Sequence, residues 1–94
     1  MNIFFRAGDI SPKPDCALEL GVVADGHAVR VELERSAIQH YLGSDCRDED
    51  AVEFVRRNRK PIERVIHAHL IAHGVPVNRH LVITANDLRA VQLV

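Results

Sequence analysis

Two histidines in the second half of the chain have the spacing that a helix uses to bind a metal ion. His69 and His73 are four residues apart, so both side chains lie on one face of an α-helix. Two imidazoles at this spacing can bind zinc, with a third ligand supplied by His40, Cys46 or His80. No glutamate lies between the pair, so the zinc-protease motif is absent.

A structural role is the favoured interpretation of these two histidines. On a helical wheel they fall in the apolar sector that is formed by Ile62, Val65, Ile66 and Leu70. His67 points to the other side of the helix. Histidines in an apolar sector are usually neutral and hydrogen-bonded, in a core or at its edge. We therefore expect no cofactor, and zinc binding by His69 and His73 is the third hypothesis for function.

The second candidate site is basic. One sector of the same helical wheel carries Arg56, Arg57, Lys60 and Arg64. Such a face can bind nucleic-acid phosphates. However, Glu53 is four residues before Arg57 and Glu63 is four residues after Arg59, which is typical of a solvated face with ion pairs. No aromatic residues alternate with the basic ones to stack on bases, so nucleic-acid binding is the alternative and not the main interpretation.

For other kinds of catalysis, the sequence does not offer a complete set of catalytic side chains. Ser36 and His40 share a helix face, but no third group or oxyanion donor accompanies them. Cys46, just before an expected helix, could be a redox thiol, although most loop cysteines have no such role. Capping and the helix dipole explain the acidic residues around this helix start, Asp45, Asp48, Glu49 and Asp50. We therefore predict that the protein is not an enzyme.

Length and composition exclude several classes of protein. The chain has 94 residues, the size of one domain spanning 1–94, with 47% hydrophobic and 27% charged residues, which excludes a disordered chain. Its net charge of −1 gives no global attraction to nucleic acid or anionic membranes. The N-terminal residues do not resemble a secretory signal, and no stretch is long and apolar enough to span a membrane. With only two cysteines, a cytoplasmic protein is expected.

The clearest structural signal is the dipeptide Asp25-Gly26, which favours a two-residue type I′ turn. It predicts a hairpin of strands 17–24 and 27–34, in which Leu18 lies opposite Leu33. In this register the apolar residues of both strands share one face, and a slip by one residue would place them in water.

Two helices are expected after the hairpin. Apolar periodicity predicts the first at 36–42, closed by Gly43, and the second at 49–73, closed by Gly74. Pro61 lies inside the second helix, so one bent helix and two abutting helices are both compatible with the sequence.

The two ends of the chain are less regular. Residues 1–15 are expected to form an extended segment and, from residue 7 onward, a loop, because regular structure is interrupted by Gly8, Pro12 and Pro14. Alternation predicts a third strand at 80–84, and Thr84 with Asp87 forms a capping box for a final helical turn. Residues 88–94 form a C-terminal tail.

Several short motifs follow one another in an order that is typical of a known protein family. They are Ala24-Asp25-Gly26-His27-Ala28-Val29, Leu33 to Ile38, Leu42-Gly43, Phe54-Val55-Arg56-Arg57-Asn58-Arg59 with Ile62-Glu63, and Leu81-Val82-Ile83-Thr84 to Asp87-Leu88. With this pattern the chain resembles, over about residues 3–88, the small bacterial family known as domain of unknown function 1488. It departs from the family at Glu34, where a capping serine is usual, and at Pro61. The resemblance implies a two-layer α+β fold and no assigned activity.

Together these signals predict an α+β fold of two layers. An antiparallel sheet of three to four short strands, made of the hairpin 17–24/27–34 and of 80–84, is covered on one face by helices 36–42 and 49–73. The most consistent function is a non-enzymatic interaction or accessory module with an unknown protein partner.

We also expect the chain to form a homodimer. Twofold dimers are the commonest closed assemblies, and the hairpin offers an unpaired strand edge. Apolar side chains with no obvious place in the core supply further surface to bury, namely Ile71, Leu88, Val91, Leu93 and Val94.

Overall fold

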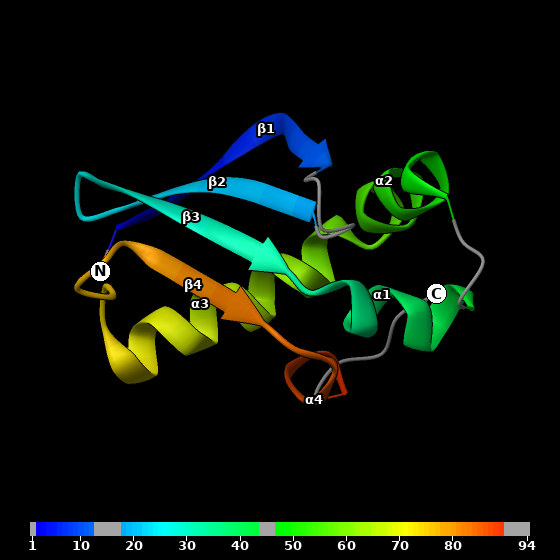
Figure 1. Cartoon of the computed structure of the whole chain (residues 1–94). Coiled ribbons are helices and arrows are strands. Elements are labelled where there is room, and N and C mark those ends of the chain that lie inside the picture. The colour runs from blue at the N-terminus through cyan, green and yellow to red at the C-terminus, as the bar shows by residue number, and fades with distance from the viewer. Residues whose placement is uncertain (1, 13–17, 44–46, 90–94) are drawn as a thin grey trace.

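The computed structural model describes residues 2–12, 18–43 and 47–89. In this part of the chain the elements follow the order β1 (Ile3–Pro12), β2 (Leu18–Ala24), β3 (His27–Leu33), α1 (Arg35–Leu42), α2 (Asp48–Arg57), α3 (Arg59–His73), β4 (His80–Ile83) and α4 (Ala85–Leu88). The four strands form one sheet, and the helices lie on one of its faces (Figure 1). The predicted two-layer α+β fold is therefore confirmed.

The central hairpin has the predicted register. Leu18 pairs with Leu33 and Val22 with Val29, and the turn between β2 and β3 is Asp25-Gly26. Both turn residues have positive φ, 50° at Asp25 and 82° at Gly26, as a type I′ turn requires. This register directs the alternate apolar residues of both strands toward the helices.

The N-terminal segment differs from the prediction, because residues 7–12 continue β1 and do not form a loop. β1 pairs antiparallel with β2, and its register shifts between Phe5 and Ile10. Gly8 lies in this irregular stretch and Pro12 at the end of the strand, positions that edge strands and bulges tolerate. Pro14 lies outside the described residues.

The strand order is β1-β2-β3-β4, and the direction of β4 corrects the prediction of a purely antiparallel sheet. β4 runs parallel to β3, with Val31 beside Leu81 and Leu33 beside Ile83. The chain between these strands forms α1, α2 and α3, which return it to the starting end of β3. A crossover of this kind joins parallel strands, so the sheet is mixed.

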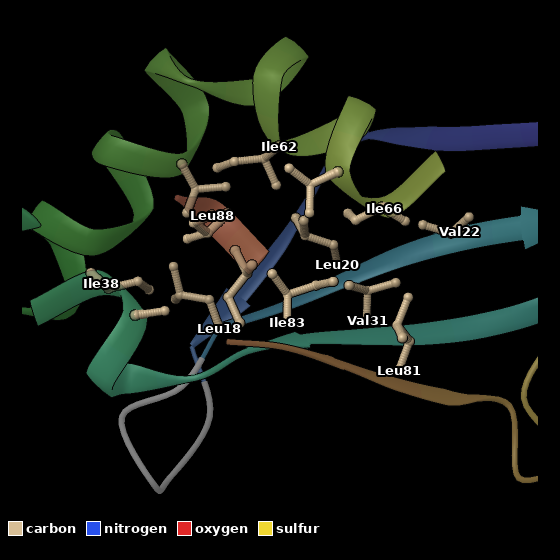
Figure 2. Packing of buried hydrophobic residues seen from close by; sticks show 14 of the residues in the cluster. Leu18, Leu20, Val22, Val31, Ile38, Ile62, Ile66, Leu81, Ile83 and Leu88 are labelled. Carbon is tan, nitrogen blue, oxygen red and sulfur yellow. The ribbon is translucent and has the colours of Figure 1, made fainter. Parts of the chain in front are cut away.

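The hydrophobic core lies between the sheet and the helices (Figure 2). Ile62 and Ile66 of α3, together with Ile38 of α1, are almost fully buried. They pack with the inward side chains of the strands, which include Leu18, Leu20, Val22, Val31, Leu33, Leu81 and Ile83. On the opposite face of the sheet Arg30 is exposed, because no helix in the described residues covers this face.

The long helical region is split into two abutting helices, one of the two arrangements that were compatible with Pro61. The break is at Asn58, which is 1% exposed and whose side-chain Nδ2 donates a hydrogen bond of 2.9 Å to the Phe54 carbonyl. Pro61 is the third residue of α3. In the first turn of a helix a missing N–H removes no helical hydrogen bond, so proline is tolerated there.

The structure of the C-terminal part removes one of the reasons for expecting a homodimer. Thr84 and Asp87 form the predicted capping box, with Thr84 N–H donating to Asp87 Oδ2 at 2.9 Å. This cap starts α4, which places Leu88 in the core of its own chain at 0% exposure. Leu88 therefore offers no surface to a partner, whereas Ile71 is 54% exposed. The remaining apolar residues of the tail lie outside the described residues, and the homodimer stays a prediction.

Candidate functional site

The basic residues of the helical region gather around the break between α2 and α3. Arg56 and Arg57 end α2, whereas Lys60 and Arg64 belong to the first turns of α3, and all four are exposed. Because the helix breaks at Asn58, the two pairs do not lie on one straight helix as the wheel assumed. The break instead arranges them beside a hollow that also reaches β1.

This hollow has a volume of about 690 Å³ and combines an apolar floor with a charged rim. The floor is formed by Phe5 and Ile10 of β1 and by Pro61 of α3. The rim is formed by Arg56, Arg57, Arg59, Lys60 and Glu63. A second hollow of about 340 Å³ shares Phe5, Lys60 and Glu63 and adds Arg64 and His67. We call the two hollows together the β1–α3 groove.

The floor residues come from the edge of the sheet. Phe5 is paired with the buried Val22, and Ile10 with the buried Leu20, so both lie on the helix-covered face. They are only half-buried, because β1 is the outermost strand and has a neighbour on one side only. Figure 1 shows β1 at the edge of the sheet, with its outer side next to no other described strand. The backbone groups on that side are therefore available for pairing.

The rim carries an excess of positive charge. Arg59 donates from Nε to Glu63 at 2.9 Å, which matches the predicted pair, and this carboxylate is the only negative group among the described residues that line the groove. Glu53 pairs with Arg56 at 3.2 Å and not, as the spacing predicted, with Arg57. Residues three apart on a helix are as close as residues four apart, so either pair was possible. In the described part of the chain, Arg57, Lys60 and Arg64 form no ion pair.

Sequence reasoning identified the basic residues but missed Phe5 and Ile10. These two residues precede α3 by some fifty positions, and the segment around Ile10 was expected to be a loop. The one signal for Phe5 is its alternation with Ile3 in the N-terminal segment, which places both on one face of a strand. Nothing in the sequence indicates that this strand lies beside the start of α3.

His69 and His73 lie in the C-terminal half of α3. The ring centres of His69 and His73 are 4.7 Å apart, with His69 half-buried and His73 exposed. His67 is exposed on another side of the helix and lines the groove. His40 is exposed in α1, where its ring contacts Tyr41 edge to face. Within the described residues, no group of three metal-ligating side chains is placed to hold an ion.

The other candidate groups have structural partners. Ser36 Oγ lies 3.4 Å from Glu34 Oε2, and Asp50 Oδ2 accepts a hydrogen bond of 3.1 Å from the Arg47 N–H at the start of α2. The Asp50 contact agrees with the capping interpretation of the acidic residues at this helix start. Asp45 and Cys46 lie outside the described residues. No helix in the described part of the chain is both long enough and apolar enough to cross a membrane.

Comparisons with known proteins bear on the fold. A scan against models of protein families finds no match, and neither does a search of curated proteins. Among solved structures, the chain is similar to the crystal structure of a protein of unknown function from the DUF1488 family of Shewanella loihica. The TM-score is 0.73 and the identity 16%, over 88% of this chain and 94% of the other. The fold of this chain is therefore that of a protein from the family known as domain of unknown function 1488.

Proposed function

We propose that this protein is a non-enzymatic interaction module whose β1–α3 groove binds an extended, acidic segment of a partner protein. The observation that supports the proposal is the groove itself, in which the apolar Phe5 and Ile10 lie in one hollow with basic side chains, two of which, Arg57 and Lys60, form no ion pair with the described residues. A hollow of this composition matches a ligand that presents both apolar side chains and carboxylates to it.

The edge position of β1 supports an extended ligand. A peptide strand that lies beside β1 can form main-chain hydrogen bonds with its free edge, as in other proteins that bind peptides by adding a strand. Alternate side chains of such a strand point to opposite sides. The set that points toward the helices can therefore cover Phe5 and Ile10 with its apolar members and pair with Arg57 and Lys60 through its carboxylates.

A protein ligand fits the groove better than a nucleic acid. The floor is apolar, and no row of aromatic side chains in the described residues offers stacking positions for bases. The net charge of −1 adds no general attraction to polyanions.

Binding of a labelled eight-residue peptide with the sequence Val-Val-Glu-Glu repeated twice, in which each face of the strand carries both valine and glutamate, tests the proposal. In fluorescence anisotropy the protein should bind this peptide and not the analogue with lysine in place of glutamate. Neutralising two rim charges, Arg57→Gln with Lys60→Gln, should weaken binding by about twofold to thirtyfold, because exposed ion pairs contribute about 0.2–1 kcal/mol each. The matched control is Arg89→Gln, an exposed arginine in the turn after α4, which should bind like the wild type.

Three outcomes would contradict the proposal. The acidic peptide fails to bind, or the neutralised variant binds it as well as the wild type does. The third outcome is tighter binding of a single-stranded oligonucleotide, with an affinity that falls steeply with salt, which would favour the nucleic-acid alternative.

We place this module in the cytoplasm. The proposal is supported by the low cysteine content, two in 94 residues, which is typical of proteins in a reducing compartment.

A further inference from the structure

A pair of neighbouring imidazoles near the end of α3 is not used by the proposed groove. His69 and His73 lie on successive turns, with their ring centres 4.7 Å apart and their planes tilted by 50°. This distance leaves the rings close enough for one nitrogen of each to reach a single ion after small side-chain rotations. Histidines four residues apart on a helix are a recurrent zinc-binding arrangement.

The ring nitrogens of both residues are available. Neither imidazole forms a hydrogen bond or an ion pair with the described residues. The half-buried His69 lies at the edge of the core, as the favoured interpretation expected, but neither histidine has the expected hydrogen bond to another described residue. His73 is exposed and His69 half-buried, so an ion can reach both rings from solvent.

The surroundings leave room for an ion and for additional ligands. The pair opens onto a hollow of about 550 Å³ between α3 and α4, which Asn86 and Asp87 also line. Asp87 Oδ2 is already used in the capping box, where it accepts from Thr84 N–H at 2.9 Å. Arg64 lines the same hollow and disfavours a cation, but its exposed charge is screened by solvent and salt.

We propose that His69 and His73 form a two-ligand site for zinc or another late divalent transition metal. Imidazole suits these ions, whereas magnesium and calcium prefer oxygen ligands. Two protein nitrogens supply half of a tetrahedral set, so water or a ligand from another molecule completes the coordination. Arg64 lines both this hollow and the β1–α3 groove, but the residues that carry the proposed peptide binding, Phe5, Ile10, Arg57 and Lys60, do not line this hollow. The two proposals can therefore fail independently.

Calorimetric titration of the full chain with zinc chloride tests the site. The wild type should show saturable binding, and His69→Ala and His73→Ala should each abolish it. The matched control is His67→Ala, which removes an exposed histidine from another side of the same helix and should leave binding unchanged. Alanine is the best helix former, so none of the three substitutions should disturb α3, and circular dichroism checks this.

Histidine ring signals in the NMR spectrum provide a second readout that does not depend on variants folding well. Zinc should shift or broaden the ring signals of His69 and His73 and leave that of His67 in place. The proposal is overturned if the wild type shows no saturable binding, or if His73→Ala binds zinc as the wild type does. It is also overturned if zinc perturbs other histidines first.

Discussion

Ile66→Ala is expected to lower the free energy of unfolding by about 2–5 kcal/mol, because it empties a fully buried position in the core. Ile66 is 0% exposed and lies where α3 crosses the sheet, among the strand residues shown in Figure 2. Alanine removes three carbon atoms and leaves a cavity that the surrounding β-strands and α3 can fill only partly. Whole domains have free energies of unfolding of about 5–15 kcal/mol, so a substantial part would be lost.

Ile71→Ala is the matched control, because it makes the same change five residues later on the same helix. Ile71 is 54% exposed, so its truncation should change the free energy of unfolding by no more than about 0.5 kcal/mol. Urea unfolding followed by circular dichroism measures both variants. Equal effects of the two substitutions would show that α3 does not bury the face that carries Ile66.

Asn58→Leu is expected to cost about 1–3 kcal/mol, because the carboxamide of Asn58 is buried and hydrogen-bonded at the break between two helices. Leucine has the same number and branching of heavy side-chain atoms, although its methyl groups are bulkier, and it cannot donate to the Phe54 carbonyl. The neighbouring Pro61→Ala is the control and should change the free energy of unfolding by less than about 1 kcal/mol, since Pro61 is in the first turn of α3.

Thermal or urea unfolding compares the two variants. If α2 and α3 instead formed one helix kinked by Pro61, removing the proline would stabilise the protein by an amount near the roughly 3 kcal/mol cost of an interior proline. In that case leucine at position 58 would also be tolerated in the helix. A stabilising Pro61→Ala together with a neutral Asn58→Leu would therefore contradict the observed break.

Local signals in the sequence predicted the elements that depend on nearby residues. The Asp25-Gly26 turn and the alternation on both sides of it determine the register of β2 and β3, because a slip would expose the apolar face. Thr84 and Asp87 likewise form a cap that needs only four residues. The turn and the capping contacts each form within a few neighbouring residues. Both could therefore be predicted without knowing how the rest of the chain folds.

Features that depend on distant contacts were not predicted. Alternation at residues 80–84 indicates a strand but not its direction, which follows from how the three preceding helices return the chain. Pro12 and Gly8 are typical of loops, yet the edge position of β1 and its shifted register accommodate both. Pairing with β2 supplies the stability that the local composition of β1 does not indicate.

The candidate site, too, was predicted only where it depends on residues that are close in the sequence. The basic residues were visible in the sequence, because Arg56, Arg57 and Lys60 lie within one helical stretch. Their arrangement around a hollow was not visible in the sequence, because it requires the break at Asn58 and the apolar floor that β1 supplies. The spacing of His69 and His73 was also visible, whereas their position beside a hollow between α3 and α4 depends on how these two helices pack.

Mapping the peptide contact by NMR is the decisive measurement for the β1–α3 groove. The ¹⁵N-labelled protein is titrated with the same eight-residue peptide of valine and glutamate, and the backbone amide shifts are followed. We predict that the largest changes occur in β1 around Phe5 and Ile10 and across residues 56–64. Changes centred on the uncovered face of the sheet, around Arg30 and Val82, or no changes at all, would contradict binding in the β1–α3 groove.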